Sequence, residues 1–555
     1  MKGTYKTHPW RIGLFFTLGL VACATLSARL WHLHVQEADF LKSQGKARAV
    51  RTIQVNAFRG LITDRNGEPL AVSTPVQSIW VNPKEVDLTH PGWQKLAKIL
   101  HVEEATVLEK LESQRSKSFL YLARQIPPPV AYKIDQLDIP GVHFLREYRR
   151  YYPAGEVTAH IVGFTDIDHH GREGIEMAYD DWLKEVPGKQ QVVKDRAGHQ
   201  VEDSVNIRAV KGGQDLALSI DRRIQYLAYR EISEAVIKHQ AKSGSVIALD
   251  VDTGEVLALA NYPSFNPNMR YRHRDSGFRN RAITDSIEPG SVMKAFSVAA
   301  ILDSGQFKTD TVVDTNPGWM YVGGHIVRDI HNYGFMDIAK ILQKSSNVGV
   351  TKLILALPKE NLQNMLNSVG FGQLTGSNFP GENPGLLRPL SKSPFALATL
   401  AFGYGMSATP LQIARSYAIL AAGGVRRPVS FLKLDQVPMG DQVMQPHVAE
   451  AMKDMLYKTV EFSATRAQVP GYPVAGKTGT VKKSKAGGYE ASKYYSLFAG
   501  FSPVENPKVA MLVIIDEPSM GQYYGGAVAA PVFSRVMQGT LAVLKVPKIK
   551  KLNNE

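Results

Sequence analysis

Residues 243–262 read SGSVIALDVDTGEVLALANY, and this stretch decides the fold that we expect. It contains two apolar runs around the turn sequence DTGE (252–255), a pattern that predicts a β-hairpin. Both runs are almost continuously apolar, so the two strands are expected to be covered on both faces. The hairpin therefore belongs in the core of a folded domain.

Two later segments extend this prediction. The segment YYSLFAGFSPVENPKVAMLVIID (494–516) repeats the order strand, proline-bounded turn, strand, and AVAAPVFSRVMQGTLAVL (527–544) is typical of a long helix that packs on a sheet. Residues 290–460 are expected to be mostly helical, because apolar residues recur there with helical periodicity. Strands, then helices, then strands again predict an antiparallel sheet that is closed by both ends of one domain.

The length of 555 residues favours more than one domain. Between residues 34 and 212, short strand-like pieces alternate with charged loops, which indicates a mixed, elongated pedestal that holds the rest of the chain away from a membrane. The predicted organisation is an N-terminal tail (1–11), a transmembrane anchor (12–33), the pedestal (34–212), the main domain (213–545) and a flexible tail (546–555).

The predicted anchor depends on IGLFFTLGLVACATLSA (12–28), which carries no charge and lies between Arg11 and Arg29. A helix over this run covers about 25 Å, and the apolar residues that follow Arg29 extend the span. A cleaved signal peptide and a lipoprotein lipidated at Cys23 are the alternatives. The length of the apolar run, and the lack of a polar spacer after Cys23, favour an uncleaved anchor, which the flanking charges orient only weakly.

The formal net charge of +14 would suit a nucleic acid, an anionic membrane surface or an anionic polymer. The basic residues are spread along the chain and no nucleic-acid motif occurs, so we expect a solvated basic surface near a membrane and no nucleic-acid partner. The single cysteine, Cys23, excludes an intramolecular disulfide and a cysteine-based zinc site. His169 and His170 have no partner at metal-ligand spacing and are expected to lie in a polar loop.

The stretch IEPGSVMKAFS (287–297) places Lys294 three residues after Ser291, at the start of an otherwise apolar helix. The chain break at EPG (288–290) puts Ser291 in the first helical turn, so the two side chains share a face and can touch. Burial and the positive end of the helix both disfavour the charged form of the lysine. A neutral Lys294 can remove the proton of the serine hydroxyl, which by itself is a weak nucleophile.

Two more motifs follow, SSN at 345–347 and KTGT at 477–480. With the S-x-x-K of Ser291 and Lys294, they resemble the motif trio of the penicillin-recognising serine enzymes. Each later motif alone has a structural explanation, as a serine cluster at a helix end or a turn at a strand edge. GYPVAGKT (471–478) also fits the pattern of a phosphate-binding loop, but Pro473 and the strand-like residues after it count against an NTPase.

Beyond these motifs, the chain resembles a class B penicillin-binding protein over almost its whole length. The similar blocks are AKSGSVIALDVDTGEVLALANYPSFNPN (241–268), RNRAITDSIEPGS (279–291), FGYGMSATPLQIA (402–414) and RGLITDRNGEPLA (59–71), and VVKDRAG (192–198) favours the division-specific, FtsI-type branch (penicillin-binding protein 3). The resemblance implies an α+β fold. Its transpeptidase domain, like serine β-lactamases, would have a five-stranded antiparallel sheet flanked by helices, joined to the pedestal and one transmembrane helix.

The resemblance also implies roles for the catalytic residues. Ser291 would attack the D-Ala-D-Ala bond of a peptidoglycan stem peptide, with Lys294 as the base. Ser345 and Lys477 would relay the proton to the leaving group. An amine of a neighbouring stem would then take the acyl group, while β-lactams would mimic the donor and trap Ser291.

Four further residues would bind the substrate. Asn347 can bond a substrate amide, and Thr478 belongs to the strand along which the peptide would lie. Gly479 lets the substrate backbone lie close to that strand. The backbone N–H of Thr480, paired with that of Ser291, can form an oxyanion hole.

These features imply a periplasmic D,D-transpeptidase, anchored in the bacterial inner membrane, that cross-links the septal cell wall during cell division. No metal or nucleotide cofactor is needed, and the implied partners are an FtsW-type glycan polymerase and other divisome membrane proteins. An elongation-type transpeptidase, a serine β-lactamase and a β-lactam sensor remain as alternatives. The anchor and the long pedestal argue against a lactamase, and the eleven residues before the anchor leave no space for a sensor's signalling domain.

Overall fold

A computed structural model describes residues 9–55, 57–193, 205–272, 276–389, 393–485 and 487–549 of the chain. The chain forms two compact units. The first unit comprises Met1–Phe58 and Glu185–Gly212, and the second comprises Arg59–Lys184 and Gly213–Glu555.

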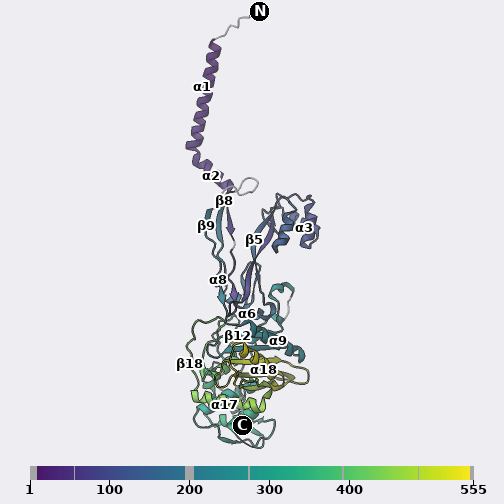
Figure 1. The fold of residues 1–555 in the computed structure, drawn as a ribbon, viewed down its shortest axis with the longest axis vertical. Coiled ribbons are helices and arrows are strands. Elements are labelled where there is room, and N and C mark those ends of the chain that lie inside the picture. The colour runs from purple at the N-terminus through teal and green to yellow at the C-terminus, as the bar shows by residue number, and fades with distance from the viewer. Residues whose placement is uncertain are drawn as a thin grey trace, which may run out of the picture. The chain divides into compact units, whose positions relative to one another are not determined.

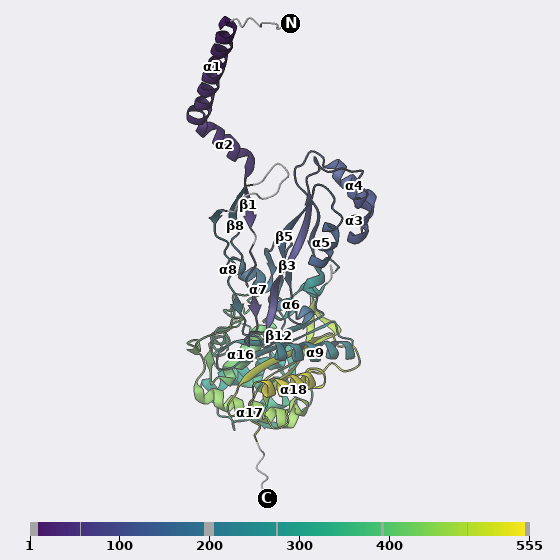
Figure 2. The ribbon, with the colours of Figure 1, turned by 45° about the horizontal axis from the view of Figure 1, so that its top comes forward.

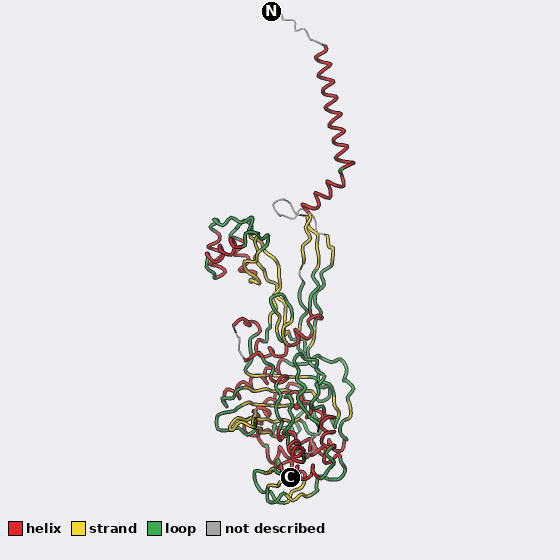
Figure 3. Tube along the Cα trace, turned by 180° about the vertical axis from the view of Figure 1, so that it is seen from behind, coloured by secondary structure: helices red, strands yellow, loops and turns green. Residues whose placement is uncertain are grey.

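The first unit contains the helix α1 (Pro9–Trp31), in which no residue is buried. The π-helix η1 (His32–Gln36) and the helix α2 (Ala38–Ala49) follow it, and Figure 3 shows α1 as a long uninterrupted helix. Among the residues that the structure describes, Pro9–Gln36 is the one helical stretch long and apolar enough to cross a membrane. A helix of this length and composition can cross a bilayer once, so this unit carries a single-pass membrane anchor.

The first unit also contains a three-stranded antiparallel sheet. Its strands, in spatial order, are β1 (Val50–Val55), β8 (Gly188–Val193) and β9 (Val205–Arg208). The family block VVKDRAG begins at the end of β8, but its residues 194–198 lie outside the described residues, as do residues 1–8 and 550–555 of the two expected tails.

The second unit is built around a five-stranded sheet in which all neighbours are antiparallel. In spatial order, its strands are β12 (Val256–Tyr262), β11 (Ser243–Asp250), β21 (Val509–Asp516), β20 (Gly488–Ser502) and β19 (Ala475–Lys485). The predicted hairpin at 243–262 and the predicted strand pair at 494–516 are therefore confirmed, and the two ends of the domain meet in one sheet.

One face of this sheet is covered by two helices, α9 (Arg222–Lys238) and α18 (Gly525–Val543), which lie side by side (Figures 1 and 2). Strand residues such as Val246 and Val513 point into this core. The predicted long helix over 527–544 is confirmed, and it packs on the sheet as expected.

The opposite face of the sheet packs on a second, larger core. Ile247 and Leu512, which follow Val246 and precede Val513 in the sequence, point into this core. The helices α11 (Lys294–Asp303) and α16 (Pro410–Ala421) form its other side. The strands are thus buried on both faces, as their continuous apolar runs predict. The helices α11 and α16 also confirm that the segment between the two strand pairs is largely helical.

Residues 59–184 of the second unit form another sheet. The long strand β3 (Pro69–Val81) pairs with β5 (Val142–Tyr151) from Val72 to Val81 and with β4 (Leu120–Ile126) at its end. Three helices pack at this end around the buried Trp93, and Figure 2 shows them beside β3 and β5. They are α3 (Gly92–Leu100), α4 (Glu104–Ser113) and α5 (Pro128–Asp135).

Two segments near the edge of the sheet are held by hydrogen bonds. Residues 482–485 and 488–493 lie in the paired strands β19 and β20, in which Lys485 pairs with Gly488. Residues 546–549, expected to belong to a flexible tail, are bonded to the segment before β19. Tyr472 Oη donates to Val546 O at 2.8 Å, and Ile549 N donates to Gly471 O at 2.9 Å.

A buried ion cluster ties residue 59 to residues 150–180. The Glu176 carboxylate is fully buried and accepts from Arg59 Nε and from Arg150 Nε, each at 2.6 Å. Arg59 also donates to Asp180 at 2.7 Å. The buried Arg150 guanidinium is thus paired with Glu176, while Arg59 is paired with both Glu176 and Asp180.

Replacing Glu176 by Gln is expected to lower the free energy of unfolding by about 3 kcal/mol, because the buried Arg150 cation loses its carboxylate partner. Chemical denaturation of the detergent-solubilised chain measures the change. Arg172→Gln is the matched control, since it removes an ion pair to Asp166 in which the arginine is 60% exposed, and about 1 kcal/mol or less is expected. Equal losses of unfolding free energy in the two variants would contradict a stabilising role of the buried ion cluster.

Candidate active site

The site is built on the short 3-10 helix η5 (Gly290–Met293), which leads directly into α11. Ser291 lies half-buried on this turn, while Lys294, the first residue of α11, is only 1% exposed. The hydroxyl of the buried Tyr417 donates to Val292 O at 2.9 Å. The turn is therefore held from inside the protein, with its serine at the surface and its lysine in the core.

Glycines allow the chain to approach Ser291 closely on two sides. Gly290 has a φ of +59°, and a Cβ there would lie 2.4 Å from Val481 Cγ2 of β19. Gly290 N donates to Gly403 O at 3.0 Å, and a Cβ on Gly403 would lie 2.2 Å from Gly290 O. These contacts give a physical reason for the EPG and FGYG sequences around the turn.

The SSN motif joins two helices. The helix α12 (Ile338–Lys344) ends at Ser345, which has a left-handed φ of +59°. The next helix, α13 (Asn347–Leu355), is capped by Ser346, whose Oγ accepts from Gly349 N at 2.8 Å. The serine cluster at these helix ends also directs Ser345 and Asn347 toward α11. The structural and the functional explanations of the SSN motif are therefore compatible.

Lys294 Nζ is the point where these segments meet. It lies 2.5 Å from Ser345 O, 2.6 Å from Asn347 Oδ1 and 3.1 Å from Ser345 Oγ. Nζ donates to all three oxygen atoms, which matches the three N–H groups of a protonated amine. A neutral amine keeps two N–H groups for the two carbonyl oxygens and has a lone pair that can act as a base.

The KTGT motif lies on β19, the edge strand of the five-stranded sheet. A Cβ on Gly479 would lie 3.1 Å from Val292 Cγ1, so this strand runs directly beside the Ser291 turn. Lys477 is buried, and Thr478 is half-buried on the same strand. Thr480 Oγ1 accepts from Gly525 N at 3.0 Å, at the start of α18. On an edge strand, the N–H and C=O groups that face away from the sheet remain available to a bound peptide.

Burial shifts both lysines toward the uncharged form. Burial, and then the neighbouring charge of Lys477, hold the pKa of Lys294 well below its usual range, and Asp329 opposes this shift. Burial lowers the pKa of Lys477 to about 8. The two lysines belong to adjoining segments, since β19 runs beside the turn that precedes Lys294. The eight residues proposed from the sequence are thus gathered around one turn and one strand edge.

Asp329 is a site residue that the sequence analysis missed. Its carboxylate accepts from Ser346 Oγ at 2.5 Å and from the backbone N–H groups of Asn347 and Val348, at 2.5 Å and 3.1 Å. It therefore holds the SSN turn in place and is also the acidic group that acts on Lys294. A single aspartate in the sequence RDIHN carries no local signal for this role.

The tip of the β19–β20 hairpin borders the same site. The ring of Tyr489 packs edge-to-face on Tyr404 at 5.8 Å between centroids. Burial, followed by the charge of Glu288, raises the pKa of Tyr489 to about 12. Glu288 itself accepts from Gly405 N at 2.9 Å and lies three residues before Ser291. Tyr489 of the β19–β20 hairpin thus lies beside the start of the catalytic turn.

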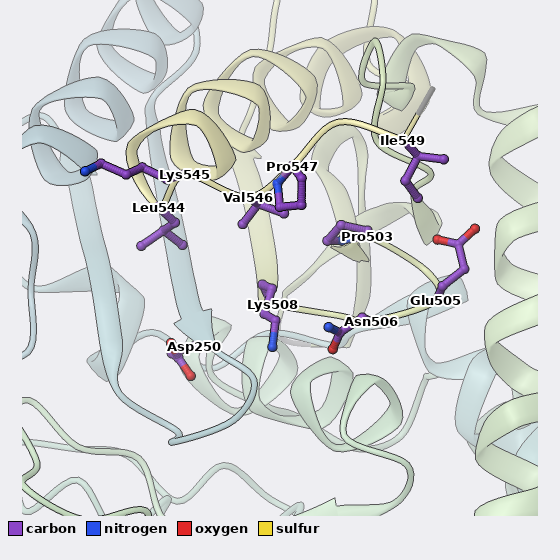
Figure 4. Close-up of a pocket in the computed structure, with 10 residues that line it drawn as sticks. All are labelled: Asp250, Pro503, Glu505, Asn506, Lys508, Leu544, Lys545, Val546, Pro547 and Ile549. Atoms are coloured by element: carbon purple, nitrogen blue, oxygen red, sulfur yellow. The ribbon is translucent and has the colours of Figure 1, made fainter. Parts of the chain in front are cut away.

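A separate pocket of about 450 Å³ lies near the end of α18 (Figure 4). It is formed between the turn after β20 and the segment that follows α18, with Asp250, Lys508 and Leu544 among its lining residues. None of the candidate site residues lines it. Within the described part of the chain, no group of three or more His, Cys, Asp or Glu side chains is arranged to hold a metal ion.

Two family models match the chain. The model for the penicillin binding protein transpeptidase domain matches residues 244–538, and that for the penicillin-binding protein dimerisation domain matches residues 54–218. The first match contains all eight candidate site residues together with Asp329.

Known proteins are similar over nearly the whole chain. It is 41% identical to the peptidoglycan D,D-transpeptidase FtsI of Escherichia coli, over 97% of this chain and 92% of that protein. It is 40% identical to the probable peptidoglycan D,D-transpeptidase PbpC of Pseudomonas aeruginosa, over 97% and 96%. The crystal structure of penicillin binding protein 3 from Mycobacterium tuberculosis, complexed with aztreonam, has a TM-score of 0.69 at 26% identity and covers 90% of this chain and 99% of that one.

Substituting Asp329 by Ala is expected to slow acylation by a fluorescent penicillin on the order of 100-fold, because the Ser345–Asn347 turn loses its anchor. The acylation rate should fall less in Asp329→Asn, because this variant keeps an oxygen atom that accepts from the two backbone N–H groups. Asp314→Asn, at an exposed carboxylate that accepts from Asn316, is the control and should acylate at the wild-type rate. If a folded Asp329→Ala variant is acylated at the wild-type rate, Asp329 does not have this positioning role.

Proposed function

This chain belongs to the penicillin-binding protein family, and from that premise we propose that it is a peptidoglycan D,D-transpeptidase of the division-specific type. The observation that carries the proposal is the buried Lys294 amine, within hydrogen-bond distance of Ser345 and Asn347 and one helical turn from Ser291. The FtsI and PbpC relatives, similar over the full chain, support the same activity rather than that of a lactamase or a sensor.

In the first half-reaction, Ser291 Oγ attacks the carbonyl carbon of the penultimate D-Ala of a stem peptide. Its proton passes to the neutral Lys294 amine as the new C–O bond forms. The backbone N–H groups of Ser291 and Thr480 are the proposed donors to the oxyanion. The peptide lies along the edge of β19, where Gly479 leaves space for its backbone and Thr478 lines the path.

Collapse of this intermediate breaks the C–N bond and releases the terminal D-Ala. Its nitrogen takes a proton from charged Lys477. The proton that Lys294 took from Ser291 then passes through the Ser345 hydroxyl to Lys477, so Lys477 is charged again and Lys294 is neutral again. Before this step, the Lys477 charge attracts the terminal carboxylate of the donor, and Asn347 bonds a backbone amide of the peptide. An amine of a neighbouring stem then attacks the ester, gives up its proton to Lys294, and regenerates the Ser291 hydroxyl.

The same geometry accounts for inhibition by β-lactams. A β-lactam offers a strained amide and a carboxylate to Ser291 and Lys477, but ring opening keeps the leaving nitrogen attached to the acyl group. The adduct therefore continues to occupy the place where the acceptor amine must enter. The related penicillin binding protein 3 of Mycobacterium tuberculosis has been solved as a complex with aztreonam, which supports β-lactam binding in this family.

We further propose that the catalytic unit faces the periplasm, with α1 in the inner membrane. The substrate supports this orientation, because cross-linked cell wall lies outside that membrane. The chemistry uses finished glycan strands, so a membrane polymerase of the FtsW type and other division proteins are the proposed partners.

The purified full-length chain is expected to join a pentapeptide donor to an added D-amino acid and to form a stable adduct with a fluorescent penicillin. Ser291→Ala should lose both activities by at least about 1,000-fold, since it removes the hydroxyl that attacks the substrate. Mass spectrometry of the products and gel fluorescence measure the two reactions. Rapid hydrolysis of the penicillin with no transfer product would instead indicate a β-lactamase.

The rate of acylation is expected to follow a bell-shaped pH profile. It should rise with pH through the lowered pKa of Lys294, as the neutral base forms, and fall above about pH 8, as Lys477 loses its charge. Lys477→Arg keeps a cation at all these pH values, so the upper limb should disappear even if the maximal rate drops. A wild-type rate that increases steadily to about pH 10 would contradict these assignments.

A further inference from the structure

A small hairpin beside the SSN turn has one buried face and one exposed face. It consists of β14 (Trp319–Val322) and β15 (His325–Arg328), with Met320 opposite Val327 and Tyr321 opposite Ile326. Val322 and Val327 are only 4% and 3% exposed, and they pack with Ala398 in a core of their own. This buried face anchors the hairpin to the domain.

The other face carries large side chains that no part of the described chain covers. Trp319 is 44% exposed, Tyr321 66% and Ile326 43%, and Arg328, directly opposite Trp319, is also exposed. The rings of Trp319 and Tyr321 pack edge-to-face at 5.4 Å between centroids, which leaves ring surface open to solvent. Two neighbouring exposed aromatic residues with an aliphatic residue and a cation form a surface that a ligand can use.

This face is attached directly to the catalytic turn. Arg328 O accepts from Asn347 Nδ2 at 3.1 Å, while the other end of the same amide, Asn347 Oδ1, lies 2.6 Å from Lys294 Nζ. The next residue after the hairpin is Asp329, which holds the SSN turn. One side chain therefore separates the hairpin from the catalytic amine, and a ligand on the exposed face would lie next to the cleft.

We propose that the exposed face of the β14–β15 hairpin, formed by Trp319, Tyr321, Ile326 and Arg328, binds the sugar backbone of the glycan strand whose stem peptide enters the cleft. This inference rests on the proposed transpeptidase function. Sugar rings present C–H groups to the negative faces of aromatic rings, and their hydroxyl and amide oxygens accept from a guanidinium group. The hairpin supplies both kinds of contact on one face.

The size and the position of the face favour a polysaccharide over a protein partner. Four side chains match one or two sugar rings, whereas a stable protein interface uses about 20 to 30 residues on each side. A stem peptide is covalently joined to its glycan strand, so the sugars must lie close to whichever cleft holds the peptide. A site that grips the strand there raises the local concentration of donor stems and leaves the chemistry at Ser291 unchanged.

The test compares substrates with and without sugar in the full-length chain in detergent. For the double substitution Trp319→Ala and Tyr321→Ala, the KM for uncross-linked glycan chains bearing pentapeptides should rise about tenfold, the effect of losing an aromatic contact. The kcat/KM for a free pentapeptide and the rate of penicillin acylation should stay within about twofold, because these ligands have no glycan. Phe335→Ala, at a residue that is 70% exposed on β16 (Phe335–Asp337), is the matched control and should change none of these values.

A second measurement does not depend on catalysis. Labelled, peptide-free glycan chains should bind the wild-type chain about tenfold more tightly than the double variant, whether or not Ser291 carries a penicillin. Equal binding by the two proteins would overturn the glycan site even if transpeptidation is intact. Equal losses of kcat/KM for the glycan-bound and the free pentapeptide in the double variant would also overturn it. So would a double variant that binds glycan normally but no longer binds another division protein. Absence of acylation in the wild type would instead count against the proposed function alone.

Discussion

The burial of one amine is the constraint on which the rest of the site depends. An ammonium group with 1% exposure is costly unless a full set of charged partners surrounds it, so burial at Lys294 drives the group toward its neutral form. A second buried amine, Lys477, strengthens this tendency by charge repulsion. Asp329 compensates only in part, since its oxygens are occupied by the SSN turn. The base is thus prepared by the fold before a substrate arrives.

The fold meets this constraint by joining three distant segments of the chain. The helix α11 carries Lys294 in the larger core, the turn between α12 and α13 presents oxygen atoms to it, and β19 closes the other side. Because β19 is an edge strand of a sheet that is packed on both faces, it is rigid and yet has one side free. A peptide can add to this side and place its carbonyl carbon at Ser291, which lies on the adjoining turn.

Much of this arrangement could be predicted from local patterns. The apolar runs of 243–262 and the residues of α18 fold as expected because their periodicity reflects burial on a sheet. Residues 546–549 were expected to belong to a flexible tail, but hydrogen bonds to Gly471 and Tyr472, which no local pattern indicates, hold their backbone. Asp329 and the exposed face of β14–β15 could not be found in this way, because their meaning arises from contacts with Ser346 and Asn347 that only the folded chain creates.

The central claim is that Lys294 makes the Ser291 hydroxyl nucleophilic. Its most direct test is to map the penicillin adduct by mass spectrometry in the wild type and in Lys294→Ala, and to measure how fast it forms. The account predicts an adduct confined to the tryptic peptide that contains Ser291, and formation slowed by at least about 1,000-fold in the alanine variant at every pH. An adduct on another residue, or equal rates in the two proteins, would contradict it.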